Sequence, residues 1–207
     1  MKKPHVVVLL DESGSMSSHR TEVITTFNEY VESVKDSAKT VSLYTFDSNG
    51  IKERFHKVPV DSVSNLTQDD YQPNALTPLY DAMGDVMNRF ADGKRNVQFV
   101  THTDGLENAS HEWTFEKLDK RIEELTSKGW LFVYLGEGLS GQQALTNFKG
   151  LKLDFNPVTR NVGMQALAST TTLYASTGEN KAQNYTSNNS DRIDVTKGEK
   201  VKAASNS

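Results

Sequence analysis

The sequence contains no cysteine. A chain without cysteine has no disulfide framework, no cysteine-bound zinc, no iron–sulfur cluster and no thiol nucleophile. An excess of positive charge is also missing, since 23 Lys and Arg residues stand against 27 Asp and Glu residues and the formal net charge is −4. Binding to a nucleic-acid backbone depends on a basic surface, so the sequence predicts no nucleic-acid partner.

Long hydrophobic runs are missing as well. The apolar run near the N-terminus covers only residues 6–10 and stops at Asp11 and Glu12. A signal peptide needs about 7–15 apolar residues and a membrane-spanning helix needs about 20. We therefore expect a soluble, cytoplasmic protein with no membrane partner.

The polar residues gather at the C-terminal end of the chain. Hydrophobic residues make up 36% of the 207 residues and charged residues 24%, which is lean but enough for the core of one domain. In residues 179–207 only seven of 29 residues are apolar, and no helical or alternating pattern appears. The sequence predicts a domain over residues 1–178 and a polar, disordered tail over residues 179–207.

Hydrophobic periodicity predicts strands that alternate with helices. The predicted strands are continuous β-branched runs, whereas the predicted helices repeat apolar side chains every three or four residues. Asn49-Gly50 predicts a tight hairpin turn with two positive-φ residues, and Gly129 predicts a helix end. The expected strands are residues 5–11, 41–47, 51–58, 97–103, 130–135 and 151–155, and the expected helices are residues 23–34, 79–90, 115–125, 140–148 and 157–177.

This alternation predicts the α/β class. We expect a doubly wound, mostly parallel six-stranded sheet of the Rossmann-like kind, with one antiparallel edge strand and helices on both faces. Ligands of such sheets bind beyond the carboxyl ends of the strands, where the strand order reverses. Asp11 closes the first strand and Asp104 the fourth. In the strand order 3-2-1-4-5-6 these strands are neighbours, so the two carboxylates are expected at one site.

Three short segments bring hydroxyl and carboxylate groups to this edge: Asp-Glu-Ser-Gly-Ser-Met at 11–16, Leu-Thr-Pro-Leu at 76–79 and Thr-Asp-Gly at 103–105. Oxygen donors of this hard kind suit Mg²⁺, Mn²⁺ or Ca²⁺ and disfavour zinc and copper. The predicted metal ligands are Asp11, Ser13, Ser15, Thr77 and Asp104.

Each segment also has a purely structural interpretation. Residues 13–18 form a Ser-rich turn with a helix cap, Thr77-Pro78 is a cap followed by a first-turn proline, and Asp104-Gly105 is a common turn pair. A capping side chain can still bind a metal, so the two interpretations are compatible. The three segments together favour a metal site.

In their order and spacing, the segments resemble the von Willebrand factor type A (vWA) domain and its metal-ion-dependent adhesion site (MIDAS). The resemblance covers residues 5 to about 177. It implies that Ser13 and Ser15 bind Mg²⁺ or Mn²⁺ directly, with Ca²⁺ less favoured. Asp11, Thr77 and Asp104 would bind directly or through water, and an Asp or Glu of a partner would complete the coordination.

The chain most resembles short, stand-alone intracellular vWA proteins of bacteria and phages. Some of these act beside AAA+ ATPases or in stress-resistance complexes, and the resemblance implies partners of that kind. We expect a metal-dependent protein-interaction module and not an enzyme. The residues expected at the partner-binding rim are Glu12, His19, His102, Glu107 and Asn108.

Two other functions stay open at this point. One is a metal-dependent phosphohydrolase or phosphoacceptor that uses Asp11. An enzyme of the haloacid-dehalogenase kind needs a second Asp two residues later, where this chain has Ser13, and the sequence has no Gly-rich phosphate loop with its Lys. The other is a structural subunit with a vestigial metal site.

Overall fold

The structure is a computed structural model that describes residues 3–90, 96–104, 106–136, 148–154, 160–177, 193–194 and 199–200. Six strands form the main sheet: β1 (His5–Asp11), β2 (Thr40–Asp47), β3 (Gly50–Pro59), β4 (Val97–His102), β5 (Leu131–Gly136) and β6 (Leu151–Asp154). The described helices are α1 (Arg20–Ser33), α2 (Leu79–Phe90), α3 (Phe115–Ser127) and α5 (Arg160–Thr177), with short 3₁₀ turns η1 (Gly14–His19) and η2 (Val60–Ser62).

The sheet has the predicted strand order, β3-β2-β1-β4-β5-β6. β1 pairs in parallel with both β2 and β4, and β3 alone pairs antiparallel, at the edge. The strand order therefore reverses between β1 and β4. This confirms the predicted doubly wound α/β class and places the ends of β1 and β4 side by side.

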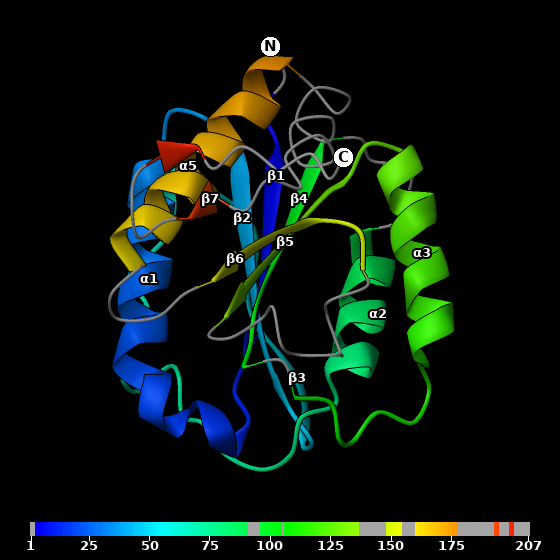
Figure 1. The fold of residues 1–207 in the computed structure, drawn as a ribbon. Coiled ribbons are helices and arrows are strands. Elements are labelled where there is room, and N and C mark those ends of the chain that lie inside the picture. The colour runs from blue at the N-terminus through cyan, green and yellow to red at the C-terminus, as the bar shows by residue number, and fades with distance from the viewer. Residues whose placement is uncertain are drawn as a thin grey trace.

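Helices cover both faces of the sheet, with α1 and α5 on one side and α2 and α3 on the other (Figure 1). Alternate residues of the buried strands divide between two hydrophobic cores. In β1, Val6 and Val8 pack under α1 and α5, whereas Val7 and Leu9 pack under α2 and α3. Because both faces are covered, the continuous apolar run of β1 is buried along its whole length.

The hairpin between β2 and β3 differs from the prediction. Asp47 pairs with Gly50, so the two turn residues are Ser48 and Asn49 and not Asn49 and Gly50. Of the predicted pair only Gly50 has a positive φ, at 129°. The Asn49 N–H donates to Asp47 Oδ1 at 2.6 Å, which shifts the turn by one residue.

Gly129 ends α3 as predicted, with a φ of 98°, and the next N–H, of Trp130, donates back to the Leu125 carbonyl. The predicted helix at 140–148 and the predicted start of the last helix at Asn156-Pro157 lie outside the described residues, apart from Phe148. Within the predicted tail, the structure describes β7 (Ile193–Asp194) paired with β8 (Glu199–Lys200). No helix in the described ranges is long and apolar enough to span a membrane.

Candidate metal centre

Asp11 lies at the centre of the predicted site, fully buried at the carboxyl end of β1. Its Oδ1 accepts a hydrogen bond from the Ser13 N–H at 2.9 Å. Its Oδ2 accepts one from the Thr103 hydroxyl at 2.6 Å, and Thr103 directly follows β4. The carboxylate therefore ties the loop after β1 to the loop after β4, as the strand order requires.

The two serines lie in the turn that connects β1 to α1. Their hydroxyl oxygens are 3.2 Å apart, so Ser13 and Ser15 point to the same place. The Gly14 N–H between them donates to the Ala75 carbonyl at 3.0 Å, and a Cβ on Gly14 would lie only 3.3 Å from that oxygen. A small residue at 14 thus lets the turn pack against the loop that leads to Thr77.

Thr77 is held against the loop that follows β4. Its N–H donates to Asn108 Oδ1 at 2.9 Å, and the Asn108 N–H donates to the Thr77 carbonyl at 3.1 Å. The Thr77 side chain is buried, whereas Asp104 is partly exposed and accepts from the Leu106 N–H at 3.2 Å. These contacts bring the three predicted segments together at one edge of the sheet.

The electrostatics of the site are unfavourable for the protein alone. Burial raises the pKa of Asp11 to about 6, and the negative charge of Asp104 adds to the effect. Hydrogen bonds from Ser13 and Thr103 lower the pKa of Asp11, but they do not compensate for burial. A cation between the two carboxylates would remove this penalty.

The residues fit a hard divalent cation. Two ligands on adjacent octahedral positions, each about 2.0–2.1 Å from the ion, are about 3 Å apart, close to the Ser13–Ser15 separation. Among the described residues no three His, Asp or Glu side chains gather as a metal cluster, so a nitrogen-rich site of the zinc type is not seen there. The donor set instead combines two carboxylates with three hydroxyls.

Glu12 does not lie at the rim where the sequence placed it. Its side chain is 1% exposed and bonds to Lys52 Nζ and to the Arg54 guanidinium, both at 3.1 Å. It also accepts from the Gln72 N–H at 2.7 Å. These contacts anchor β3 and the segment around Gln72 to the end of β1.

Glu107 also has a structural role. It accepts from the Tyr80 N–H at the start of α2 at 2.9 Å, and from the Ser110 N–H and hydroxyl at 2.9 and 2.7 Å. Its carboxylate therefore caps α2 and fixes its own loop. Asn108 is exposed, but it too has a structural task, because its side chain and backbone hold Thr77.

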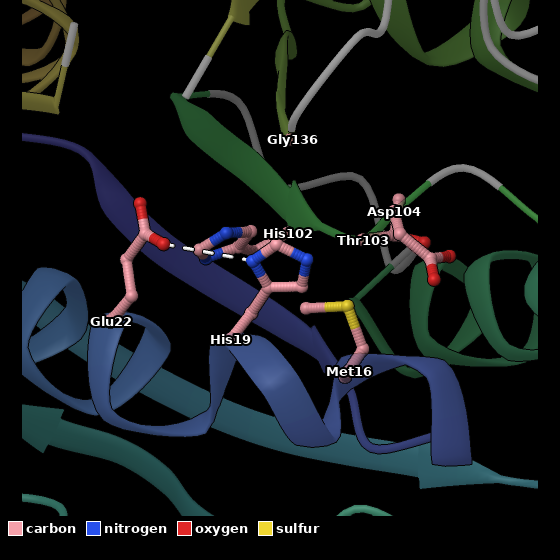
Figure 2. Close-up of a pocket in the computed structure, with 7 residues that line it drawn as sticks. All are labelled: Met16, His19, Glu22, His102, Thr103, Asp104 and Gly136. Atoms are coloured by element: carbon pink, nitrogen blue, oxygen red, sulfur yellow. Dashed lines mark ion pairs between the residues drawn. The ribbon is translucent and has the colours of Figure 1, made fainter. Parts of the chain in front are cut away.

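His19 and His102 line a small pocket beside Asp104, on the α1 side of the site (Figure 2). His19 is partly exposed and lies 3.6 Å from Glu22. His102 is buried, and burial lowers its pKa to about 4, so its ring is neutral near pH 7. Both imidazoles lie next to the predicted metal ligand Asp104. His19 is partly exposed, whereas the burial of His102 contradicts its predicted place on the partner-binding rim.

Two residues at the site escaped the sequence analysis. Thr103 stands in the Thr-Asp-Gly segment, where the sequence assigns it no role, and its hydroxyl donates to Asp11 Oδ2. Tyr71 is fully buried, and its hydroxyl donates to the Asp11 carbonyl. The local sequence around Tyr71 does not predict that contact, because the two residues are 60 positions apart.

Polar side chains at the reversal point of a doubly wound sheet are typical of α/β domains that bind ligands at the carboxyl edge of the sheet. Within that class, the fold is that of vWA domains. A vWA protein from Catenulispora acidiphila superposes with a TM-score of 0.59 at 13% identity, over 83% of this chain and 42% of that one. The vWF domain of the pilus tip protein Mfa5 from Porphyromonas gingivalis gives 0.59 at 11% identity, over 82% and 95%.

Two further proteins of similar fold have structures with a bound metal. The manganese-loaded TRAP protein of Plasmodium vivax matches with a TM-score of 0.51 at 18% identity, over 70% of this chain and 61% of that one. A mussel byssus protein with a zinc-occupied MIDAS matches at 0.50 and 15% identity, over 84% and 47%. This chain spans about half the length of several of these proteins. No family model and no curated protein matches the sequence.

Proposed function

We propose that this chain is a protein-interaction module that binds a divalent cation and, through it, an acidic side chain of a partner protein. The observation that carries the proposal is the arrangement of the Ser13 and Ser15 hydroxyls, 3.2 Å apart, beside the Asp11 carboxylate, whose pKa is raised by burial. The fold shared with manganese- and zinc-loaded vWA proteins supports it.

The residues of the site would have different roles. Asp11, Ser13, Ser15, Thr77 and Asp104 would hold the ion, with Mg²⁺ or Mn²⁺ preferred. A dication bound there would supply a strong, oriented attraction for one more anionic oxygen. Asp11 is already engaged by Thr103 and the Ser13 backbone, so it contributes charge and orientation while the exposed Ser15 faces the partner.

The proposal makes the chain a binding protein without an enzymatic reaction. The position two residues after Asp11 is occupied by Ser13, whose hydroxyl pairs with Ser15, so no acid–base carboxylate stands there. A hydrolysis assay with p-nitrophenyl phosphate and Mg²⁺ tests whether the chain is an enzyme. Turnover that Asp11→Asn abolishes would favour the phosphohydrolase instead.

The resemblance to stand-alone intracellular vWA proteins supports a cytoplasmic partner such as an AAA+ ATPase or a stress-resistance complex.

Metal binding is measured by thermal unfolding of the full chain, with and without Mg²⁺ or Mn²⁺. An ion that binds only the folded state stabilises it by about 2.7 kcal/mol at 100 times its dissociation constant. We expect the melting temperature to rise with either ion and to return to the metal-free value in EDTA. An unchanged melting temperature at millimolar Mg²⁺ and Mn²⁺ would contradict the proposal.

Matched variants locate the ion. Ser13→Ala, Thr77→Ala and Asp104→Ala should remove the metal-dependent rise, because each takes away one donor. Asp36→Asn is the control, since Asp36 is an exposed carboxylate remote in sequence from the three segments. A metal-dependent rise that persists in Asp104→Ala would place the ion elsewhere.

A further inference from the structure

Two exposed leucines border the candidate metal centre. Leu76 is 55% exposed and Leu106 is 48% exposed, and no other large hydrophobic side chain in the described residues is exposed. Leu76 directly precedes Thr77, and Leu106 follows Asp104 by two residues. Isolated apolar side chains are common on protein surfaces, but both of these adjoin predicted ligands of one ion in the sequence.

The two leucines come from loops that run side by side. Thr77, next to Leu76, and Asn108, close after Leu106, exchange two hydrogen bonds of 2.9 and 3.1 Å. The first loop enters α2 and the second follows β4, and Leu76 and Leu106 are 30 positions apart in the sequence. Only the fold makes the leucines neighbours of one site.

The backbone holds both leucines in their exposed positions. The Leu76 N–H donates to Ser48 Oγ at 3.1 Å, and the Leu76 carbonyl accepts from the Ser48 N–H at 3.0 Å. The Leu106 N–H donates to Asp104 Oδ1 at 3.2 Å. A partner that covers these side chains would therefore meet backbone that is already held in place, which lowers the conformational entropy lost on binding.

We propose that Leu76 and Leu106 form an apolar contact surface for an extended protein segment in which the acidic residue at the metal is flanked by an aliphatic or aromatic side chain. This inference rests on the proposed function and specifies the partner of the same site. Consecutive Cα atoms are 3.8 Å apart, so residues beside a metal-bound acid come within reach of side chains beside the metal ligands. Acidic flanking residues would instead meet the negative charges of Asp104 and Glu107.

The test uses a display library of random heptapeptides with Asp or Glu fixed at the centre. The full chain is the target in Mg²⁺, and elution with EDTA keeps only metal-dependent binders. We expect Leu, Ile, Met or Phe to be enriched next to the fixed acid. The selected peptides should bind Leu76→Ser and Leu106→Ser about tenfold more weakly than the unaltered chain, as for contact residues that matter to affinity.

Matched variants separate this inference from the proposed function. Leu76→Met and Leu106→Met keep an apolar side chain and should keep the affinity, whereas Asp104→Ala should lose it entirely. Metal-dependent peptides without apolar enrichment, or with unchanged affinity for the serine variants, would overturn the leucine surface and leave the proposed function intact. Failure to recover any EDTA-eluted peptide would overturn both.

A second copy of the chain is the other possible occupant of this surface. Sedimentation of the unaltered chain in Mg²⁺ distinguishes it. A monomer at every concentration supports a separate partner. A Mg²⁺-dependent dimer that both serine variants abolish would overturn the choice of a separate partner.

Discussion

At the scale of single residues, Asp11 shows a conflict between stability and function. A carboxylate with no exposed surface is favoured at this position only if a cation compensates for its burial. Its two oxygens are hydrogen-bonded, yet its pKa is still raised from 3.8 to about 6. The residue is therefore explained by the proposed metal better than by the metal-free fold.

Replacing Asp11 by Asn should stabilise the metal-free protein near pH 7.5. The pKa of Asp11 is higher in the folded than in the unfolded state. Its protonated carboxyl therefore contributes its full stability below pH 3.8, and this stability is lost as the pH rises through about 6. The loss amounts to about 3 kcal/mol for a shift of this size. Denaturant unfolding in EDTA should give Asp11→Asn a larger free energy of unfolding than the unaltered chain at pH 7.5. The difference should shrink as the pH falls from 6 to 4.

The same variant should gain nothing from Mg²⁺, whereas the unaltered chain should be stabilised. Asp36→Asn, at an exposed position, should follow the unaltered chain under all conditions. If Asp11→Asn is less stable than the unaltered chain in EDTA at pH 7.5, the burial penalty assigned to Asp11 is wrong.

Glu12, its neighbour, has the opposite character. The Gln72 N–H, Lys52 and Arg54 surround its buried carboxylate, and these contacts lower its pKa below 4.5 although burial alone would raise it. Glu12→Ala should therefore reduce the free energy of unfolding by about 2–3 kcal/mol near pH 7, since Gln72 and the two cations lose their acceptor.

The sign of the pH dependence distinguishes this effect. A lowered folded pKa means that the stabilisation is present above pH 4.5 and is lost as the pH falls below it. Urea unfolding at pH 7 and pH 3 should thus show a large difference between Glu12→Ala and the unaltered chain only at pH 7. Glu32→Ala removes an exposed pair with Lys35 and should change stability by less than about 1 kcal/mol.

At the scale of elements, α2 is positioned by the loop that carries Glu107 and Asn108. The Asp81 carboxylate accepts from the N–H groups of His111, Glu112 and Trp113, at 2.7, 3.0 and 2.7 Å. The Trp113 ring lies on Gly84 so closely that a Cβ there would be 2.1 Å from the ring. A side chain at 84 therefore pushes against the loop that supports Thr77.

Gly84→Ala should destabilise the protein by about 1–3 kcal/mol, as overpacked core positions do. In a helix free of such contacts the same change stabilises by about 1 kcal/mol. The sign of the change in stability therefore shows whether Trp113 packs closely on Gly84. Thermal unfolding measures the effect, and Mg²⁺ affinity should fall as well. Asp85→Ala, exposed on the same helix, is the control and should change little. A more stable Gly84→Ala would contradict the close packing of Trp113.

The β2–β3 hairpin shows why element boundaries are harder to predict than elements. The pattern of residues 41–58 indicated two strands and a tight turn, and both strands form. The turn lies one residue earlier because Asp47 accepts from the Asn49 N–H, a side-chain contact that competes with the Asn-Gly preference.

At the scale of the whole molecule, the two cores account for the stability of the domain. They draw on the six-stranded sheet and on α1, α2, α3 and α5, and residues 179–207 offer only seven apolar side chains among 29. Removing residues 179–207 should therefore change the free energy of unfolding by less than about 1 kcal/mol. Denaturant unfolding of the shortened and full chains checks this, and a larger loss would show that the tail packs on the domain.

The sequence by itself determined the class and the strand order, and it predicted five candidate ligands. Local signals suffice for these, because apolar periodicity reflects burial and the parallel strand order brings the residues that close β1 and β4 to one edge. The structure describes Asp11, Ser13, Ser15, Thr77 and Asp104 at that edge, and their binding of a metal stays a prediction.

Only the tertiary structure decided what surrounds those ligands. Glu12 and Glu107 look like rim residues in the sequence, but contacts with residues up to 60 positions away make one a buried anchor and the other a helix cap. Leu76 and Leu106 look like ordinary loop residues until the fold leaves them exposed beside one site. A side chain's partners depend on which distant segments the fold brings near, and no local pattern encodes that.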